Sequence, residues 1–497
     1  MPEEAMPEAT LRPQKLRLRL LGAAGVVFLF AGWAVASVAT GSFFVPAPWT
    51  TAADTVLLLT REASWTQIVI TFLRVCIGFV VGYVAGIAAG IAIGARREIA
   101  ALLRPLVLFF QGMPPLLWAI PLVALMGIGH VPTIIVITLI TFPLVAVTIG
   151  EGMSTLPRDL REMLAIFAPG FAARTRELVL PHLAPFLGAA VNTGLVLAVK
   201  ASVTAEYFGA NDGIGFQIQS AYMSLRIRSL FSWAAVLVLL ILLFNWLLPR
   251  IRRAGPLLKR RAADRAPFVG ELEDVEDLKR VFASRPRTPG ISLKGVTFSY
   301  PHHDAVLGGL DLTVKPGDIA VVTGESGIGK TTMLKLAASL LKPAAGTIVA
   351  PARIGYVFQD DRLLPWRTVA ENTALPLLYQ GFSRKNALRF AYSLLSEAGL
   401  TGEEGKNPDE LSGGMKKRAA LARCFARLPD AILMDEPFSG LHARARTLLW
   451  KMFLRLHGLH PVPALIVTHY PDEITSQARC RLYTLQGSPA RIAAGAR

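Results

Sequence analysis

Residues 324–331 form a glycine-rich octet that carries the clearest chemistry in this sequence of 497 residues. Its spacing is G-x-x-x-x-G-K-T, and its members are Gly324, Glu325, Ser326, Gly327, Ile328, Gly329, Lys330 and Thr331, followed by Thr332. The glycines let backbone N–H groups approach nucleotide phosphates, the lysine can reach the β- and γ-phosphates, and the first threonine can help to coordinate Mg²⁺. The flanking residues predict a buried strand before the octet and a helix after it. ATP and Mg²⁺ are therefore the expected cofactors.

A pair of adjacent carboxylates follows the apolar run 431–434. A buried strand that delivers carboxylates to a phosphate site is what nucleotide hydrolysis requires. We expect Asp435 to hold Mg²⁺ with Thr331, and Glu436 to polarise the attacking water as a catalytic residue.

The first half of the chain accounts for most of the 53% hydrophobic content. Six apolar stretches reach the length of a membrane span, about 20 residues. They lie at residues 21–39, 68–94, 106–127, 131–150, 186–208 and 230–248. Arginine and lysine are more frequent before the first stretch, in alternate connections and after the sixth, which predicts that both termini face the cytoplasm.

The net charge of +17 fits contact with membrane lipid beside the apolar stretches better than nucleic-acid binding, since no recognition motif accompanies the charge. The three cysteines show no spacing typical of a disulfide framework or a metal site.

Polar and helix-breaking residues interrupt some of the expected spans. The third contains Gln111 and three prolines, which predict a kinked helix that either lines a pathway or simply packs at a kink. The fifth contains Lys200 and Glu206, which point in different directions from a helix. Ionisable groups at membrane depth usually face a bundle interior or a watery cavity, although such side chains can also snorkel to the interface.

The connection before the fifth span resembles the coupling loop of ABC importer permeases. Glu162 and the later Leu-Val-Leu-Pro run that ends at Pro181 match its pattern, whereas the family glycine is replaced by Ala168. Residues 205–219 are similar to the corresponding region of permeases for sulfonates, taurine and nitrate. The resemblance covers most of residues 60–250 and implies the importer direction of transport.

The second half resembles an ABC ATPase. The resemblance implies that Tyr300 stacks on adenine, that Gln359 touches Mg²⁺ and senses the permease, and that His469 contacts the γ-phosphate. It also implies that the signature Ser412, Gly413 and Gly414 of one chain closes on the phosphates held by a second copy, which makes a homodimer necessary. His442 stands where the family usually has an aspartate, which puts the speed of closure in doubt.

These features predict a multidomain chain. We expect a cytoplasmic tail at 1–20, an all-α permease of the type I importer kind with six spans at 21–253, a linker at 254–290, and an α/β P-loop ABC ATPase at 291–497. The predicted function is ATP-driven import of a small anion, such as a sulfonate, taurine or a nitrate-like compound, across the bacterial inner membrane. A separate periplasmic or lipid-anchored binding protein would deliver it. An exporter half-transporter and a non-transporting ATP-dependent sensor are the alternatives.

Overall fold

The computed structural model describes residues 8–167, 169–254, 289–475 and 480–493. The chain divides into two compact units, one made of Met1–Leu156 and His182–Lys259 and the other of Pro157–Pro181 and Arg260–Arg497. The short segment that interrupts the first unit in sequence therefore belongs to the second. Most of the linker expected at 254–290 lies outside the described residues.

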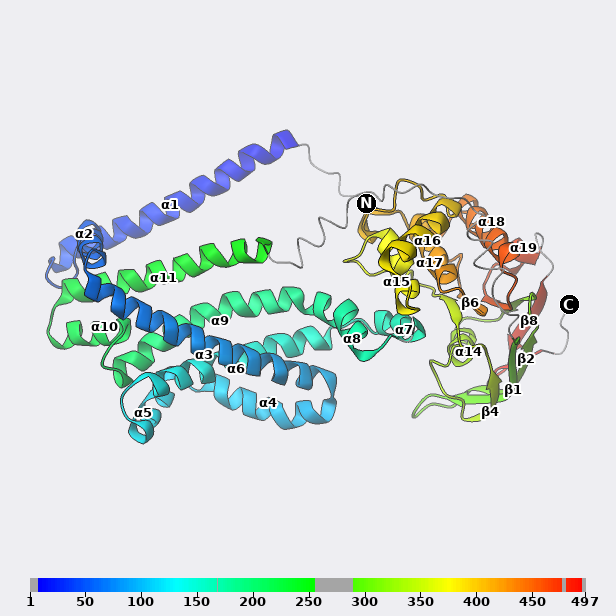
Figure 1. Cartoon of the computed structure of the whole chain (residues 1–497), viewed down its shortest axis with the longest axis horizontal. Coiled ribbons are helices and arrows are strands. Elements are labelled where there is room, and N and C mark those ends of the chain that lie inside the picture. The colour runs from blue at the N-terminus through cyan, green and yellow to red at the C-terminus, as the bar shows by residue number, and fades with distance from the viewer. Residues whose placement is uncertain (1–7, 168, 255–288, 476–479, 494–497) are drawn as a thin grey trace. The chain divides into compact units, whose positions relative to one another are not determined.

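Helices are the only regular secondary structure in the described residues of the first unit (Figure 1). Five of its helices are long and apolar enough to cross a membrane, or six if one bent pair forms a single span. The helices are α1 (Glu8–Thr40), α2 (Pro48–Leu59), α3 (Glu62–Ala95), α4 (Arg97–Gly112), α5 (Pro115–Met126), α6 (His130–Ser154), α9 (Leu180–Gly209), α10 (Ile214–Met223) and α11 (Ile227–Ala254). The tail expected at 1–20 is already helical from Glu8 onward.

The third expected span differs from a single kinked helix. It consists of α4 and α5, whose axes differ by 92°. Met113 and Pro114 between them adopt extended backbone angles. Proline lacks an N–H and disfavours helical geometry in the residue before it, so the adjacent Pro114 and Pro115 separate the two helices completely.

Helices α3 and α6 pack against each other through a row of glycines. Gly78, Gly82, Gly86, Gly90 and Gly94 recur at every fourth position of α3. A Cβ at Gly86 would lie 2.6 Å from the Cβ of Val145, and one at Gly90 would lie 2.7 Å from the Cβ of Ile149, both on α6. Small residues at this spacing let two membrane helices approach closely, so the row specifies this helix pair.

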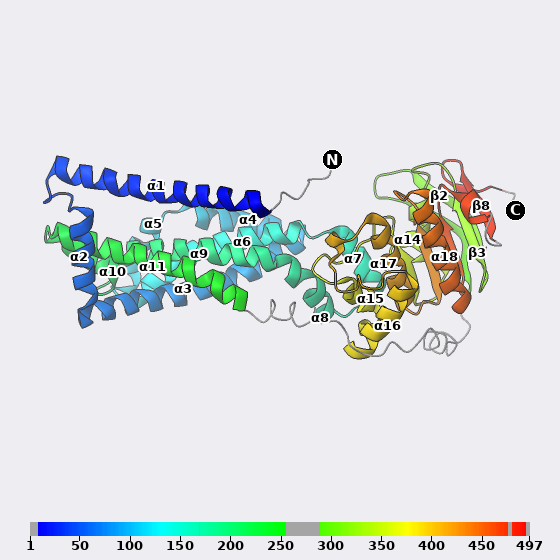
Figure 2. The same cartoon turned by 90° about the horizontal axis from the view of Figure 1, so that it is seen from above.

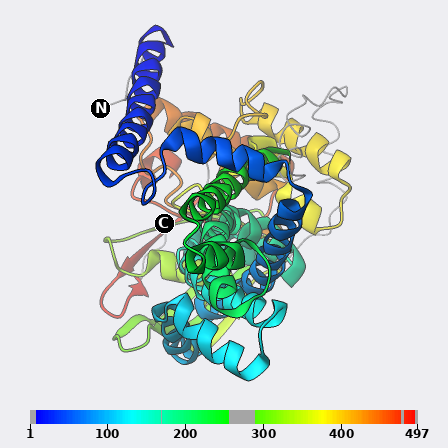
Figure 3. The ribbon, with the colours of Figure 1, turned by 90° about the vertical axis from the view of Figure 1, so that its left-hand side faces the viewer.

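Two short helices were not expected from the sequence. Helix α2 follows α1 after a short connection that begins at Gly41, whose φ is 83°, and it packs on α11. Figure 3 shows the two blue helices at an angle to each other. Helix α10 follows α9 and packs on α11 and α3. Both are too short to cross a bilayer.

The second unit contains two sheets and the helices that cover them (Figure 2). A three-stranded antiparallel sheet has the order β2-β1-β4, and a six-stranded sheet has the order β5-β6-β7-β3-β8-β9 with all neighbours parallel except the last pair. The strands are β1 (Ile291–Ser299), β2 (Ala305–Val314), β3 (Ile319–Thr323), β4 (Ala345–Val349), β5 (Ile354–Val357), β6 (Ala431–Asp435), β7 (Ala464–Val467), β8 (Arg481–Gln486) and β9 (Arg491–Ile492).

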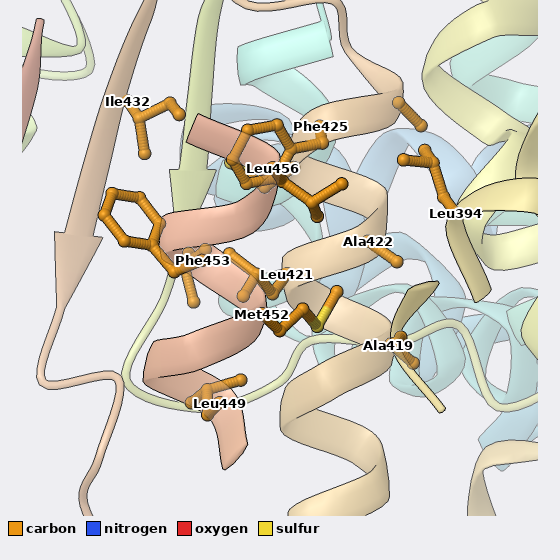
Figure 4. Packing of buried hydrophobic residues seen from close by; sticks show 14 of the residues in the cluster. Leu394, Ala419, Leu421, Ala422, Phe425, Ile432, Leu449, Met452, Phe453 and Leu456 are labelled. Carbon is orange, nitrogen blue, oxygen red and sulfur yellow. The ribbon is translucent and has the colours of Figure 1, made fainter. Parts of the chain in front are cut away.

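Helices connect and cover these strands, as a parallel sheet requires. They are α7 (Arg158–Phe167), α8 (Phe171–Arg174), the π-helix η1 (Thr175–Val179), α14 (Lys330–Ala337), α15 (Val369–Tyr379), α16 (Arg384–Glu397), the 3₁₀ turn η2 (Pro408–Glu410), α17 (Gly413–Ala426), α18 (Ala443–Leu459) and α19 (Pro471–Thr475). The main core lies where α17 and α18 meet the sheet, around the fully buried Phe425 and Phe453 (Figure 4). This core fixes the strand edge on which the site described below is built.

Residues after Thr484 look like a frayed tail in the sequence, and this expectation is wrong for the residues described. Strand β8 continues to Gln486, and β9 pairs with it through Leu485 and Ile492. Strand β9 has only two residues, so the sequence alone shows no alternation of apolar and polar residues that would predict a strand there.

Candidate functional site

The first six residues of the glycine-rich octet form the loop between β3 and α14, and its last two begin α14. Gly327 and Gly329 have φ values of 81° and 108°, a region that favours glycine. The Lys330 ammonium donates to the carbonyl oxygens of Gly324 and Glu325, both at 2.8 Å, and therefore curls over its own loop. Backbone N–H groups at a helix start attract anions. The arrangement can accept phosphate groups.

The predicted pair of acids lies at the carboxyl edge of the same sheet. Strand β6 is separated from β3 by β7 alone, and all three are parallel. The hydroxyl of Thr331 consequently reaches Asp435 and donates to its Oδ1 at 3.1 Å. Burial raises the pKa of Asp435, while the hydrogen bond from Thr331 opposes this shift. Two oxygen ligands of the kind that Mg²⁺ prefers thus stand side by side.

Glu436 and His469 also lie together. His469 Nε2 is 3.2 Å from Glu436 Oε1, and the His469 backbone N–H donates to Oε2 at 3.3 Å. The first contact lacks hydrogen-bond geometry, so Oε1 is buried without a donor among the described residues. Burial raises the pKa of Glu436, and the nearby His469 opposes this shift. A carboxylate with one unused oxygen can accept a proton from water.

Glu436 has a φ of 46°, although it is not glycine. Its backbone N–H donates to the carbonyl of Val467 on β7. A non-glycine residue in this region is strained and is often found at functional positions. The turn directs the carboxylate away from the strand and toward His469.

The remaining residues expected around the nucleotide occupy different positions. Tyr300 is partly exposed, and its hydroxyl lies 3.2 Å from that of Thr332 on α14, so the ring lies beside the phosphate loop. Gln359 follows β5; its carbonyl accepts from Lys417, while its exposed side chain has no hydrogen bond in the described residues. The signature Ser412, Gly413 and Gly414 begins α17, where the Ser412 hydroxyl caps the helix by accepting from Met415.

The segment expected to couple the two halves is packed into the second unit. Glu162 on α7 accepts from Lys335 on α14 and from Arg362, both at 3.0 Å. Burial opposes ionisation of Glu162, but these two partners outweigh it and lower the pKa of the carboxyl group. Arg362 follows Gln359 by three residues. One carboxylate therefore joins this segment both to the phosphate-loop helix and to the loop of Gln359.

Further contacts hold the same segment. Arg427 donates to the carbonyls of Ile166 and Phe167 at 3.2 and 3.3 Å. The Glu177 carboxylate pairs with Arg367, and its carbonyl accepts from the Trp366 indole at 3.0 Å. These partners are not predicted by the sequence. Their only signal was a cluster of Arg and Trp shortly after Gln359, which is also common on protein surfaces.

The other residues proposed for coupling contribute less. Ala168 lies outside the described residues. Pro181 lies in the first turn of α9 and closes the segment.

The candidate pathway residues of the first unit do not form one cluster. Gln111 is exposed near the end of α4. Glu206 is fully buried and paired with Arg74 on α3, a partner that the sequence analysis did not find. Lys200 is exposed, and it lines a cavity between α9 and α11. The two ionisable groups of α9 thus point in different directions, as their spacing predicts.

Comparison with known proteins finds a family match in each half of the chain. Residues 307–439 match the ABC transporter family model, and residues 78–254 match that of the binding-protein-dependent transport system inner membrane component. Among curated proteins, the aliphatic sulfonates import ATP-binding protein SsuB 2 of Streptomyces avermitilis is 41% identical over 187 residues, which are 37% of this chain and 72% of the relative. SsuB 1 of Rhodococcus jostii is 38% identical, with 40% of this chain and 80% of the relative covered.

A third relative has another substrate in its name. The formylaminopyrimidine import ATP-binding protein ThiZ of Halalkalibacterium halodurans is 37% identical, with 37% of this chain and 74% of the relative covered. The three relatives align with 37–40% of the present chain, because they correspond to its ATP-binding half. The chain belongs to the ABC transporter family, and it joins a membrane permease domain and an ATP-hydrolysing domain in one polypeptide.

Proposed function

We propose that this chain imports a small organic or inorganic anion across the bacterial inner membrane, driven by ATP hydrolysis. A sulfonate, taurine or a nitrate-like compound is the expected substrate. The ATP-binding half resembles import proteins for aliphatic sulfonates, and the permease half matches a component of binding-protein-dependent systems. A separate solute-binding protein on the far side of the membrane would deliver the substrate.

The residues of the nucleotide site fit ATP and Mg²⁺. The loop N–H groups and Lys330 would hold the phosphates, and Thr331, Asp435 and Gln359 would hold the metal. Bound Mg²⁺ would neutralise charge that develops on the phosphate oxygens. The 3.1 Å contact between Thr331 and Asp435 supports this fit, because it places two hard oxygen ligands together. Tyr300 would lie beside the adenine ring.

Glu436 would act as the general base. Its buried Oε1 lacks a hydrogen-bond donor in the described residues and is free to accept a proton from water. His469 would keep this carboxylate oriented through its ring and backbone N–H. The strained turn at Glu436 fixes the carboxylate in advance of the reaction.

A homodimer would complete the site. The signature residues Ser412–Gly414 are at the N-terminus of α17, and Ser412 and Gly413 are exposed. A helix N-terminus favours negative charge, so this surface would close on the phosphates held by a second copy. Two composite sites would then form, one on each side of the dimer.

The observation that carries the proposal is the position of Glu162. Its segment is continuous in sequence with α6 and α9 of the permease unit, and its carboxylate contacts Lys335 on the phosphate-loop helix at 3.0 Å. Movement of α14 or of the Arg362 loop during the ATP cycle would therefore pull on the permease helices. This link favours transport over a non-transporting sensor.

The direction follows from the kind of coupling segment. It is short, with α7 of ten residues, and Glu162 and Pro181 match the pattern of importer permeases. With arginine and lysine concentrated in alternate connections, both termini and the ATPase would face the cytoplasm.

Reconstituted transport tests the proposal. Proteoliposomes should move labelled ethanesulfonate when ATP, Mg²⁺ and periplasmic extract from the producing cells are present, and not when ATP is replaced by ADP. ATP hydrolysis without movement of ethanesulfonate, taurine or nitrate would favour the sensor alternative. Transport at the same rate with and without the periplasmic extract would contradict the need for a binding protein.

A further inference from the structure

An open cavity lies between α9 and α11 of the helical unit. Its volume is about 410 Å³, within the range of about 300–1,000 Å³ that is typical of small-molecule sites. The cavity is lined by Asn192, Thr193, Val196, Leu197, Lys200 and Asn245. The first five lie on one face of α9, because positions 192, 196 and 200 and positions 193 and 197 each recur at intervals of four residues.

The ammonium of Lys200 belongs to a helix that is long and apolar enough to span the membrane. Lys200 lies nine residues before the end of α9, which is about 13 Å along the helix axis at 1.5 Å per residue. Cations at such a depth are costly and persist where they face water, a partner or a ligand. The cost requires a compensating interaction.

The described residues contain no such interaction for Lys200. No hydrogen bond or ion pair reaches its ammonium within them, and no carboxylate lines the cavity. Arg74 in the same unit shows the opposite condition, since its guanidinium is 2% exposed and pairs with both Glu206 and Asp212. One membrane cation is therefore compensated by the protein, whereas the other faces an open cavity.

The lining of the cavity carries hydrogen-bond donors around that cation. Asn192 and Asn245 each offer an amide N–H₂, and Thr193 offers a hydroxyl. Val196 and Leu197 supply an apolar wall. A cation with neutral donors and an adjacent apolar surface is complementary to a small anion that has several oxygens and a short hydrocarbon part.

We propose that this cavity is an anion-binding subsite in the permease unit, with Lys200 as its charge-recognising residue and Asn192, Thr193 and Asn245 as donors to the anion's oxygens. This inference rests on the proposed function and sharpens it. The subsite selects an alkanesulfonate or a similar small oxyanion, and it does not suit a formylaminopyrimidine, which has no negative charge for Lys200 to recognise.

The test compares two substitutions at Lys200 with a control. Lys200→Met keeps the length and apolar packing but removes the charge, and Lys200→Arg keeps the charge. Arg228→Met removes an exposed cation at the start of α11, whose nearest carboxylate is 3.9 Å away. Uptake of labelled ethanesulfonate and basal ATP hydrolysis are measured in the same proteoliposomes.

We expect Lys200→Met to lower kcat/KM for ethanesulfonate uptake about tenfold or more, mainly through KM, with basal ATP hydrolysis unchanged. Lys200→Arg should recover most of the loss, and Arg228→Met should behave like the parent. Uptake by Lys200→Met at the parental rate would overturn the subsite, as would a loss that Lys200→Arg does not recover. If Lys200→Met does not insert into the membrane, Asn192→Leu is measured in its place. A raised KM for ethanesulfonate uptake would support the subsite, and an unchanged KM would overturn it.

Measurements on the parent protein distinguish failure of the subsite from failure of the proposed function. If the parent hydrolyses ATP but moves no ethanesulfonate, taurine or nitrate, the proposed function fails. If the parent transports an anion and Lys200→Met does so equally well, only the subsite fails.

Discussion

A cluster of buried charge in the helical unit and one in the ATPase unit differ in how completely their charges are compensated. In the helical unit, Arg74 donates to Glu206, Asp212 and His130, and Glu206 accepts in addition from Thr71 and from the backbone N–H of Gly215. Both charged groups of the central pair are satisfied within the protein. This cluster joins α3 to the turn between α9 and α10.

The cluster in the ATPase unit is left incomplete. Lys330 is held by two loop carbonyls without an ion pair at contact distance, and the buried Oε1 of Glu436 has no donor in the described part of the chain. A buried polar atom without a partner costs free energy, which a ligand can recover when it binds. The cluster around Arg74 can therefore stabilise the fold without a ligand, whereas the cluster around Glu436 keeps a group that a ligand or the attacking water can satisfy.

The largest effect should come from the catalytic carboxylate. Glu436→Gln removes the general base but keeps the size of the side chain, so ATP hydrolysis should fall by about 10²–10⁴-fold. Binding of a fluorescent ATP analogue should persist, since the phosphate loop is unchanged. Glu397→Gln, which breaks an ion pair with the exposed Arg455, is the control. Hydrolysis by Glu436→Gln at the parental rate would exclude Glu436 as the base.

Substitutions in the cluster around Arg74 should lower the stability of the fold rather than the rate of ATP hydrolysis. Arg74→Met leaves Glu206 buried and unpaired, which should lower the free energy of unfolding by about 3–5 kcal/mol. The double substitution of Arg74 and Glu206 by methionine should restore part of that loss, because no unpaired charge remains. Thermal unfolding in detergent measures both, with the exposed Arg97→Met as the control. Equal melting temperatures of Arg74→Met and the parent would show that the ion pair between Arg74 and Glu206 does not stabilise the fold.

A smaller effect should follow from loosening the coupling segment. Glu162→Gln weakens two partly exposed contacts, to Lys335 and Arg362, and should lower the number of anions moved per ATP about fivefold. Basal hydrolysis should change little, because the nucleotide residues are intact. Arg158→Gln on the same helix has an exposed side chain and serves as the control. Unchanged stoichiometry in Glu162→Gln would remove this carboxylate from the coupling mechanism.

The smallest effect concerns pH. Burial raises the pKa of Glu436 above that of an ordinary glutamate, so its carboxylate protonates earlier as the pH falls. The base is present above its raised pKa and lost below it. ATP hydrolysis should therefore decline on the acid side at a higher pH than an unperturbed glutamate would give. A decline of ATP hydrolysis that begins only at or below the ordinary pKa of glutamate would contradict the assignment of Glu436 as the base.

The nucleotide residues could be predicted because short sequence motifs encode them. The glycine-rich octet and the pair of acids are each contiguous, and parallel strands bring their ends to one edge. The contact between Thr331 and Asp435 follows directly from that topology.

The helical unit was less predictable, because its contacts join distant residues. Arg74 is 132 positions from Glu206 and 138 from Asp212. The sequence marks Glu206 as unusual but contains no local signal for its partner. The glycine row of α3 was not predicted to be an interface, because its role depends on α6, which is a separate segment. The complete break at Pro114 was also missed, since proline in a membrane helix can produce a kink or an interruption.

The direction of anion movement relative to ATP tests the central claim most directly. In proteoliposomes of mixed orientation, ATP added outside activates only those molecules whose ATPase unit faces outward. With ethanesulfonate and periplasmic extract sealed inside, import predicts that labelled ethanesulfonate leaves the lumen toward the ATP, and that Glu436→Gln stops this movement. Accumulation inside vesicles that are supplied with external ATP and external ethanesulfonate, with no efflux in the first arrangement, would contradict import and identify an exporter.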